Sequence, residues 1–401
     1  MISRHDNTHI NYLEFLLNKN GVEGELKTKI KTLFPLTDPY RLFFLLGLIA
    51  LIMGILLWSL FQFKLISFYP RFEHGDLMFM AALWCFIAGF MMTAIPKMTN
   101  TFSVKIIELI IALGLVFFQA VAIFTQLREA SGVIYFLQIL FLVNFVFRRI
   151  WVRKVVPFEG FYFIPFAFFS ALVGSLFLAF SYQINLVYLF IGKAFVLNLI
   201  LGIGSRLIPA ISKTAQALMP DVQTQKNKKL QYLIYALGLN FGFYTEAFLS
   251  KEIGMIIQFI YVILISVTHL KLFQRMTTFT ILGLGLKISL VLLWLYYCLN
   301  IFGINHLAAT HFLYIGVILL ITIMVATRVM VAHGGQSLNY EIHSKRLWLV
   351  LSLIVIATFL RFFSGNDIMG YLLTAAMYSL LLAIVLWSYK FCKILKDKIK
   401  N

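Results

Sequence analysis

The chain has 401 residues, of which 61% are hydrophobic and only 12% are charged, and its mean hydropathy is +0.90. A soluble protein of this length needs a far more charged surface, so the composition excludes a soluble globular protein and predicts an all-α, multi-pass membrane protein. The net charge of +18 does not indicate a nucleic-acid partner, because the basic residues lie between apolar runs rather than on one soluble face.

Three regions are expected along the chain. Residues 1–40 are polar and charged and are predicted to form a cytoplasmic N-terminal extension without a cleavable signal peptide. Residues 41–390 are predicted to form the transmembrane domain, and residues 391–401 a basic cytoplasmic tail. The three cysteines lie far apart, which argues against a disulfide framework.

Apolar runs of about 20 residues, each long enough to cross roughly 30 Å of hydrocarbon, predict about twelve transmembrane helices. The predicted spans are 42–62, 77–95, 104–125, 132–147, 161–181, 183–203, 230–249, 253–270, 279–299, 310–330, 347–363 and 370–390. Alternate loops, counted together with the N-terminus, carry most of the 34 Lys and Arg residues. The positive-inside rule therefore predicts that both termini are cytoplasmic and that the number of spans is even.

Two histidines are expected at the outer ends of spans. His74 opens the second span and His311 opens the tenth. An imidazole at a helix end that faces the interior of a bundle is a common axial ligand of heme iron, which makes both residues metal-binding candidates. Asp76 is a candidate to orient the His74 ring by accepting a hydrogen bond. The alternative is that both histidines only cap their spans at the membrane interface.

A second group of polar residues is expected at the inner ends of spans. Arg206 closes the sixth span, and Arg328 and His333 close the tenth. The arginines suit bidentate contacts with carboxylates or phosphates, including porphyrin propionates, or act only as positive-inside anchors. Since a continuous helix rises about 1.5 Å per residue, His311 and His333 are roughly 33 Å apart and cannot bind one metal ion. His333 is therefore either a metal candidate at a separate site or a structural residue.

Lysines inside spans are rare because a charge in hydrocarbon is costly. Lys193 and Lys287 lie near the middles of their predicted spans. Each either pairs with an anion, for example Glu246, or extends toward a lipid headgroup, and the sequence favours neither. The chain contains no Walker loop, GxGxxG, HExxH or GxSxG motif, so no enzyme class is predicted.

Five segments, taken in order and spacing, resemble the NnrS family of bacterial inner-membrane proteins. They are YRLFFLLG (40–47), FIAGFMMTAIPKMT (86–99), GIGSRLIPA (202–210), THFLYIGVILL (310–320) and TRVMVAHGGQSL (327–338). The resemblance covers residues 40 to about 390 and implies about twelve helices, heme, copper, and a role in the response to nitric oxide and nitrosative stress. Arg41, Arg206 and His311 lie where the family has those residue types, and Arg328 and His333 match its most specific motif.

The chain departs from the family pattern in two places. The family has a His-x-His-Glu stretch at the start of the second span, where this sequence reads Glu73-His74-Gly75-Asp76. After the tenth span, HGGQ replaces HTGR. A fainter similarity joins HGDLMFM and HFLYIGV to the second and tenth helices of the catalytic subunit of heme-copper oxidases and nitric oxide reductases, and it supports pairing His74 with His311.

The leading hypothesis is an NnrS-like heme protein of the bacterial inner membrane that binds nitric oxide or transfers electrons received from a membrane or periplasmic donor. His311 and His74 would hold the heme, while Arg206, Arg328 and His333 would form a polar cluster at the cytoplasmic end. Two other classes remain open: a cofactor-free transporter or channel for a small anion, and a membrane sensor or a metal and heme assembly factor. Whether the protein is an enzyme is left undecided by the sequence.

Overall fold

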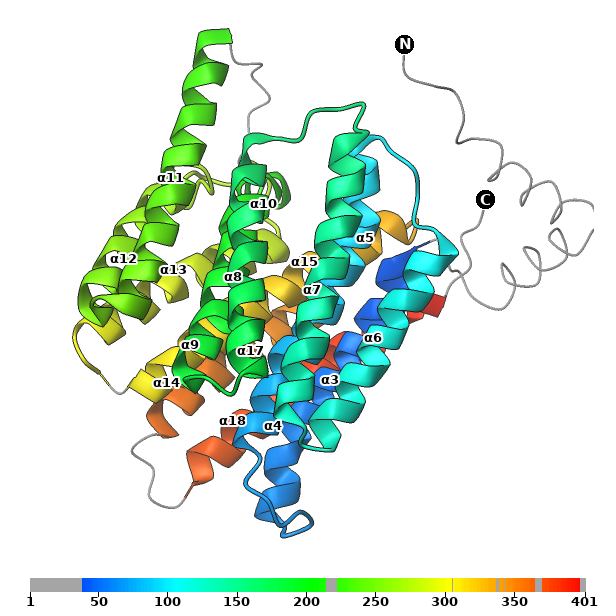
Figure 1. Cartoon of the computed structure of the whole chain (residues 1–401), viewed down its shortest axis with the longest axis vertical. Coiled ribbons are helices and arrows are strands. Elements are labelled where there is room, and N and C mark those ends of the chain that lie inside the picture. The colour runs from blue at the N-terminus through cyan, green and yellow to red at the C-terminus, as the bar shows by residue number, and fades with distance from the viewer. Residues whose placement is uncertain are drawn as a thin grey trace, which may run out of the picture.

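The structure is a computed structural model, and all regular elements in the part that it describes are helices (Figure 1). The described residues are 38–213, 222–304, 306–336, 339–342, 344–364 and 370–396. The N-terminal extension up to residue 37 and the end of the tail from residue 397 lie outside these ranges. The predicted all-α class is confirmed, as expected for a chain whose backbone groups must be satisfied internally in hydrocarbon.

Eleven helices within the described residues are long and apolar enough to cross a membrane, so the chain is a multi-pass membrane protein. Their bounds extend the predicted spans by a few residues at most ends, which is the usual error of a hydropathy prediction. Six of them precede residue 212: Pro39–Gln62 (α3), Arg71–Thr99 (α4, η1 and α5), Ile106–Phe124 (α6), Arg128–Trp151 (α7), Glu159–Ala179 (η2 and α8) and Ile184–Ile211 (α9, η3 and α10).

The second half of the chain begins with α11 (Val222–Phe248), a long helix that packs along α12. It contains the predicted span 230–249, but its basic start and Glu246 make it less apolar than the other eleven. The remaining helices are α12 (Lys251–Thr268), α13 (Ile281–Ile301), Leu307–His333 (α14, η4 and α15), the short α16 (Asn339–Ile342), α17 (Lys345–Phe363) and α18 (Tyr371–Lys396).

Three helix starts in the second half show how local sequence sets the boundaries. The side-chain oxygens of Ser250, Thr280 and Ser344 each accept a hydrogen bond from the backbone N–H three residues ahead, at the starts of α12, α13 and α17. Such caps satisfy one of the free N–H groups of a helix end, and each typically contributes about 1 kcal/mol. The loops therefore end where the sequence supplies a hydroxyl.

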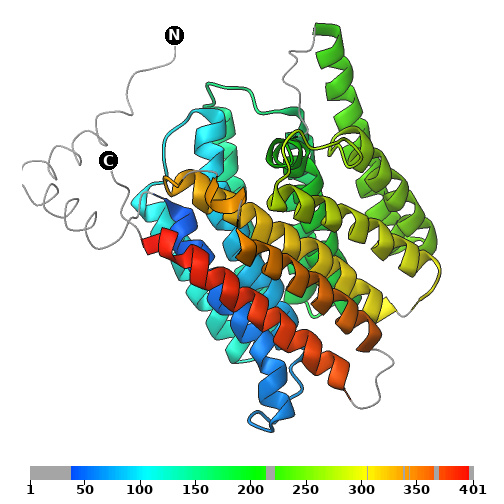
Figure 2. The same ribbon diagram turned by 180° about the vertical axis from the view of Figure 1, so that it is seen from behind.

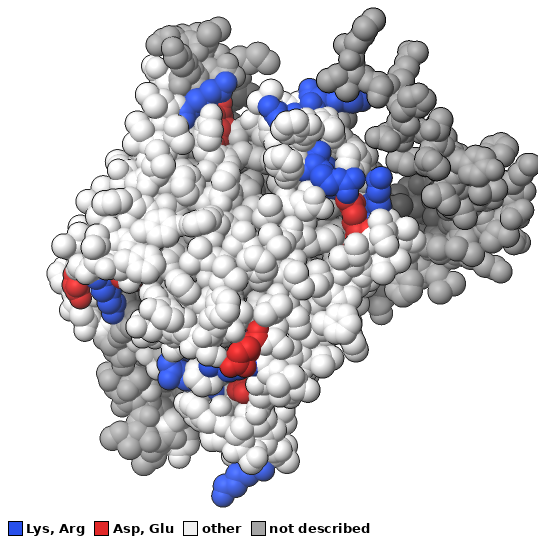
Figure 3. Space-filling model, viewed as in Figure 1, with Lys and Arg blue, Asp and Glu red and all other residues white. Residues whose placement is uncertain are grey.

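The bundle has two chemically different ends. The first and last helices lie side by side, and Arg41 Nη1 donates a hydrogen bond to the Ile394 carbonyl oxygen over 2.8 Å (Figure 2). We call this end, with Asp38 and Lys396, the terminal end, and the opposite end, with His74 and His311, the histidine end. A broad band without Lys, Arg, Asp or Glu separates them on the face shown in Figure 3, as expected for a surface that contacts lipid.

The second, sixth and tenth spans form the centre of the bundle, with 72%, 78% and 67% of their apolar windows buried. Each contains one π-helical segment in its half toward the histidine end, flanked by α-helix. The successive segments are α4 (Arg71–Asp76), η1 (Leu77–Leu83) and α5 (Trp84–Thr99); α9 (Ile184–Val187), η3 (Tyr188–Phe195) and α10 (Val196–Ile211); and α14 (His306–His311), η4 (Phe312–Leu319) and α15 (Leu320–His333). Because π-helical turns are rare and concentrate at functional sites, this half of the bundle is the first place to look for a site.

Candidate functional site

The two predicted outer histidines lie at the same end of the central spans. His74 is part of α4 and His311 ends α14, and both side chains are partly buried. The imidazole of His74 is close enough to His311 for the two to interact electrostatically, and both interact with the guanidinium of Arg361 near the end of α17. The structure therefore brings the pair together and adds a cation that the sequence did not indicate.

Each ring has one nitrogen engaged by the backbone. Nδ1 of His74 is 2.8 Å from the Gly54 carbonyl oxygen, and Nδ1 of His311 is 2.9 Å from the Leu307 carbonyl oxygen. A carbonyl oxygen can only accept, so both Nδ1 atoms carry the proton and donate it. Nε2 of a neutral ring is then an unprotonated donor for a metal, which is the arrangement that metal-ligating histidines usually show. Among the described residues, neither Nε2 has a hydrogen-bond partner.

Aromatic neighbours fix the orientation of both imidazoles. The Trp58 ring of α3 meets His74 edge to face, with the ring centroids 5.8 Å apart. Tyr314, in the first turn of η4, lies in the same way beside His311, with the centroids 6.2 Å apart. The rings are thus held from one side by aromatic contacts and from another by backbone carbonyls, which limits their rotation.

The three π-helical segments meet directly below the histidines. Phe79 of η1 packs against Tyr314 of η4, with ring centroids 4.7 Å apart, and against Tyr188 of η3 at 6.1 Å. Gly192 of η3 completes the junction, because a Cβ atom at that position would lie 3.2 Å from both the Phe79 ring and the Tyr314 hydroxyl oxygen. The missing side chain lets three spans approach closely, so the histidine end has a rigid aromatic floor.

Asp76 lies near His74 in the sequence but has other partners in the structure. Its carboxylate is 3% exposed and interacts electrostatically with Arg128 and Glu73, as well as with the Tyr188 hydroxyl. Arg128, from α7, is held over the Phe72 ring at 4.0 Å from the centroid. Within the described residues Asp76 therefore belongs to a charged group beside the histidines and makes no hydrogen bond to the His74 ring.

A buried ion pair lies beside the aromatic floor. Nζ of Lys193, in η3, is 2.6 Å from Oε2 of Glu246, in α11, so the pairing alternative predicted for this lysine is confirmed. Gln258 Nε2 donates to the same carboxylate oxygen over 2.6 Å, and Tyr297 OH donates to Gln258 Oε1 over 3.1 Å. Lys287, by contrast, reaches out of its helix and donates to the Gln274 carbonyl oxygen.

The ammonium group of Lys193 is also enclosed by aromatic rings. It lies 5.9, 5.5 and 5.4 Å from the ring centroids of Phe243, Tyr296 and Tyr297, within cation–π distance. Lys193 is only 4% exposed. A carboxylate, an amide and three rings thus replace the water that this cation loses, which explains how a lysine is tolerated deep in a membrane span.

At the terminal end, His333 has a different environment from His311. Its Nδ1 is 2.7 Å from Nζ of Lys97, the last-turn lysine of α5, and its ring packs against Tyr40 with centroids 5.9 Å apart. An ammonium group can only donate, so Nδ1 of His333 accepts and the ring proton resides on Nε2. In this arrangement neither nitrogen of His333 offers a free lone pair to a metal ion.

Arg328 and His333 have different partners. Its Nη2 is 2.6 Å from Oε1 of Glu341, which α16 presents after the turn that follows α15. Glu341 is completely buried, and burial raises the pKa of its carboxyl group to about 6 although the Arg328 guanidinium opposes the shift. The most specific sequence motif therefore contains two separate interactions, one for Arg328 and one for His333.

The two other predicted arginines lie apart from each other. Arg206 is exposed near the end of α10, with its guanidinium 5.4 Å from the Phe158 ring centroid. Arg41 is 4% exposed at the start of α3, beside Tyr40, Asp38 and the Ile394 carbonyl. Arg41 therefore adjoins the His333 group through Tyr40, whereas no described contact joins Arg206 to Arg328 or His333.

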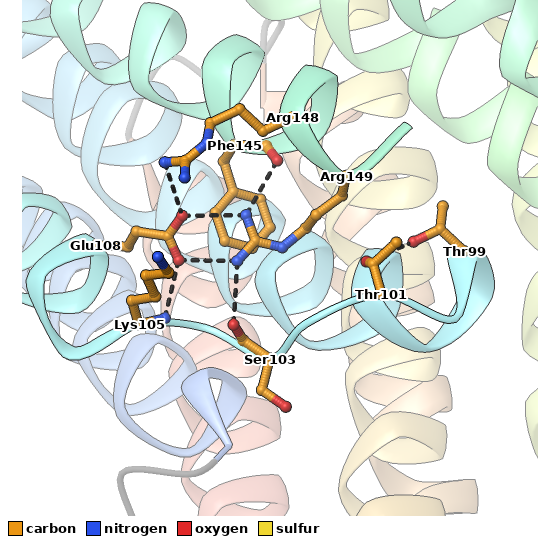
Figure 4. Close-up of polar contacts among 8 residues, drawn as sticks. All are labelled: Thr99, Thr101, Ser103, Lys105, Glu108, Phe145, Arg148 and Arg149. Atoms are coloured by element: carbon orange, nitrogen blue, oxygen red, sulfur yellow. Dashed lines mark hydrogen bonds and ion pairs between the residues drawn. The ribbon is translucent and has the colours of Figure 1, made fainter. Parts of the chain in front are cut away.

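A further buried pair at the terminal end was missed by the sequence analysis. Glu108, in the first turn of α6, accepts hydrogen bonds from both terminal nitrogens of Arg149 over 3.1 and 2.8 Å (Figure 4). The same arginine donates to the Ser103 and Phe145 carbonyl oxygens, and Arg148 approaches the carboxylate from the other side. This cluster therefore joins α6, α7 and the loop before α6.

The donor atoms decide which cofactor the histidine end fits. Two imidazoles with free Nε2 atoms, near one arginine, are a suitable set for axial ligation of heme iron and for contact with a propionate. Among the described residues, no group of three or more His, Cys, Asp and Glu side chains could hold a metal ion. The two imidazoles therefore offer ligand atoms for a heme iron, and the described residues form no group for a separate copper ion.

Several residues around this site were not predicted, and their sequence signals are weak. Arg361 looked like one of the few outer-side charges, and Tyr314 and Trp58 look like ordinary interfacial aromatics. The only local signal was a small residue inside a span, such as Gly192. Hydropathy alone does not reveal that such a residue allows a close contact between helices. The site is formed by residues from five different helices, and their proximity is a property of the packing.

The sequence matches a known protein family. The family described as "NnrS protein" matches residues 35–398, a range that contains all the described residues and therefore every residue of the histidine end. No curated protein matches the sequence.

Proposed function

The chain belongs to the NnrS family, and on this premise we propose that it is a heme protein of the bacterial inner membrane that binds nitric oxide at the histidine end. The observation that carries the proposal is the pair of imidazoles whose Nδ1 protons are donated to backbone carbonyl oxygens. This fixes the tautomer of His74 and His311 and leaves both Nε2 atoms available for a metal. The bilayer is then the only partner that the fold itself requires.

The surrounding residues have separate roles in this proposal. Trp58 and Tyr314 hold the two rings in place, and the Phe79 junction closes the space beneath them against the rest of the bundle. Arg361, which interacts with both histidines, provides a fixed positive charge for a propionate or for an anionic nitrogen oxide. The bound heme iron would supply the affinity for nitric oxide and the capacity to take up an electron.

The anion-transport alternative gains little support from the contacts of its cations. That alternative uses Lys193, Lys287, Arg206 and Arg328 to line an anion path. Lys193 is paired with Glu246, Arg328 with Glu341, and Lys287 donates to a backbone carbonyl, whereas Arg206 packs on the Phe158 ring. Three of the four cations therefore already have polar partners, and they belong to different parts of the bundle. A sensor or a heme assembly factor would use the same two histidines, and it differs from the leading proposal in binding heme weakly and transiently.

The experiment that tests the proposal is an absorption spectrum with iron quantification on the purified full-length protein, before and after addition of nitric oxide. We expect about one heme per chain, a spectral shift with nitric oxide, and loss of both in His74→Ala and His311→Ala. His269→Phe is the matched control, because His269 is stacked on Tyr232 at 3.9 Å and lies apart from this site. A heme-free wild type, or an unchanged spectrum in both alanine variants, would falsify the proposal, and weak substoichiometric heme would favour the assembly factor.

A further inference from the structure

A long apolar groove lies between the central spans on the side of the terminal end. It is lined mainly by α5, α10 and α15, together with Phe44 of α3 and Leu83 of η1, and it is open on one side. The lining contains no charged residue, and its one side-chain hydroxyl, that of Thr322, already donates to the Ile318 carbonyl oxygen. The groove therefore offers no hydrogen bond to a ligand and suits a hydrocarbon chain.

The length and position of the groove match one leaflet of a membrane. Its lining on α10 runs from Val196 to Ile208, which is roughly 18 Å at about 1.5 Å per residue. Half of a hydrocarbon core of about 30 Å is about 15 Å, the depth that one acyl chain of a lipid reaches. Because α10 ends at Ile211, the groove begins near the membrane surface at the terminal end and stops near the middle of the bundle.

A cation stands at the surface end of this groove. Arg206 follows two lining residues, Ile203 and Gly204, and precedes a third, Leu207, so its backbone lies in the stretch of α10 that lines the surface end of the groove. It is exposed, and in the described part of the chain it makes a cation–π contact with Phe158 but no ion pair with a carboxylate. A planar guanidinium in this position suits bidentate contact with a phosphate group.

We infer that the groove binds one acyl chain of a membrane phospholipid whose phosphate is held by Arg206. The charge of the arginine matches the phosphate and the apolar lining matches the chain. The arginine also lies on the last turns of α10, near the membrane surface at the terminal end, where a lipid headgroup lies. Phe158, in the loop that joins α7 to η2, packs against the guanidinium. This site is independent of the histidine end and of any heme.

The test measures phospholipid retained by the purified full-length protein after extensive washing in detergent, by native mass spectrometry and phosphorus analysis. We expect about one phospholipid per chain in the wild type and about tenfold weaker retention in Arg206→Gln, since a charge-assisted contact is lost. Val325→Phe places a ring in the groove and should reduce retention to a similar extent. Rebinding is then followed with washed protein and vesicles of phosphatidylglycerol or phosphatidylcholine.

Two variants serve as matched controls. Arg153→Gln removes another cation of the same end, whose Nη1 only donates to the Ile150 carbonyl oxygen. Val133→Phe adds a ring on the half-exposed face of α7, outside the groove lining. Both should retain lipid as the wild type does, and all four variants should elute as monodisperse helical protein. The inference is overturned if the washed wild type holds no phospholipid, if Arg206→Gln and Val325→Phe both retain it fully, or if the retained molecule is an isoprenoid quinone.

Discussion

The two ends of the span Leu307–His333 carry a histidine each, and the chemistry of the two residues is opposite. At one end Nδ1 of His311 donates to the Leu307 carbonyl oxygen, so that Nε2 is free to bind a metal. At the other end Nδ1 of His333 accepts from Lys97, so that Nε2 carries the proton. The partner of Nδ1 therefore decides whether Nε2 is free to bind a metal. The position of the histidine in the sequence does not decide it.

The polar groups near the two histidines also differ in how deeply they are buried. Near His311, the Lys193–Glu246 pair is enclosed by rings and an amide deep in the bundle. Near His333, Lys97 is exposed to solvent and joins the ring through a single contact. Electrostatic interactions are strong in the first environment and screened in the second. The histidine end is therefore expected to respond far more strongly to substitution.

The largest expected effect separates the two histidines of this span directly. If His311 holds the heme as proposed, His311→Ala should lower the heme content of the purified protein by at least about tenfold, because a ligand of the iron is removed. His333→Ala should leave the heme content unchanged, since the ring has no free lone pair in the folded protein. Heme content per chain is measured from the absorbance of the reduced pyridine complex.

Free imidazole sharpens this test. Added to the His311→Ala protein, it should enter the space left by the ring and restore part of the wild-type spectrum, whereas it should not change the His333→Ala spectrum. Equal loss of heme in both variants, with no rescue, would mean that the two ends do not differ in the way their hydrogen bonds indicate.

The second effect concerns the buried ion pair of the histidine half. Lys193→Met leaves the Glu246 carboxylate without its cation and should lower the free energy of unfolding by about 3–5 kcal/mol. Lys193→Met combined with Glu246→Gln removes both charges, keeps an amide near Gln258, and should recover much of that loss. Thermal unfolding in detergent, followed by tryptophan fluorescence, gives the comparison. A double variant as unstable as the single one would contradict this account.

The fold was largely predictable from the sequence, and the site only in part. Apolar runs and the distribution of Lys and Arg are enough to predict an all-helical membrane protein, because the bilayer allows few alternatives. The π-helical segments were not predictable, since η3 around Gly192 has the same hydropathy pattern as an α-helix. Their positions depend on how three spans pack against each other.

Some residues of the candidate site could be predicted from the sequence and others could not. His74 and His311 were recognisable because each opens a predicted span and both lie on the same predicted side of the membrane. Arg361 was not, because a charge at the end of a span is usually an anchor, and only the packing of α17 brings it to both histidines. The predicted cluster of Arg206, Arg328 and His333 stays a prediction as a functional site, since each of the three has its own separate contacts.

A third, smaller effect is expected from pH at the terminal end. Burial raises the pKa of Glu341 from 4.5 to about 6, so the folded protein holds this proton more tightly than the unfolded chain. Its contribution to stability is therefore present below pH 4.5 and is lost as the pH rises through about 6, by about 2 kcal/mol in total. Glu341→Gln should remove this part of the pH dependence, as measured by unfolding midpoints between pH 4 and pH 7. An identical pH profile in the variant would exclude Glu341 as its source.

The smallest effect is expected from a change in Lys97, the lysine that contacts His333. Lys97→Met removes the donor to Nδ1 of His333, but the lysine is exposed, so the free energy of unfolding should change by less than about 1 kcal/mol. Heme content should not change, because His333 lies roughly 33 Å along the helix from His311. A loss of heme in Lys97→Met would place a heme contact at the terminal end. In that case the contact with Lys97, and not a free Nε2 atom, would mark the histidine of this span that binds heme.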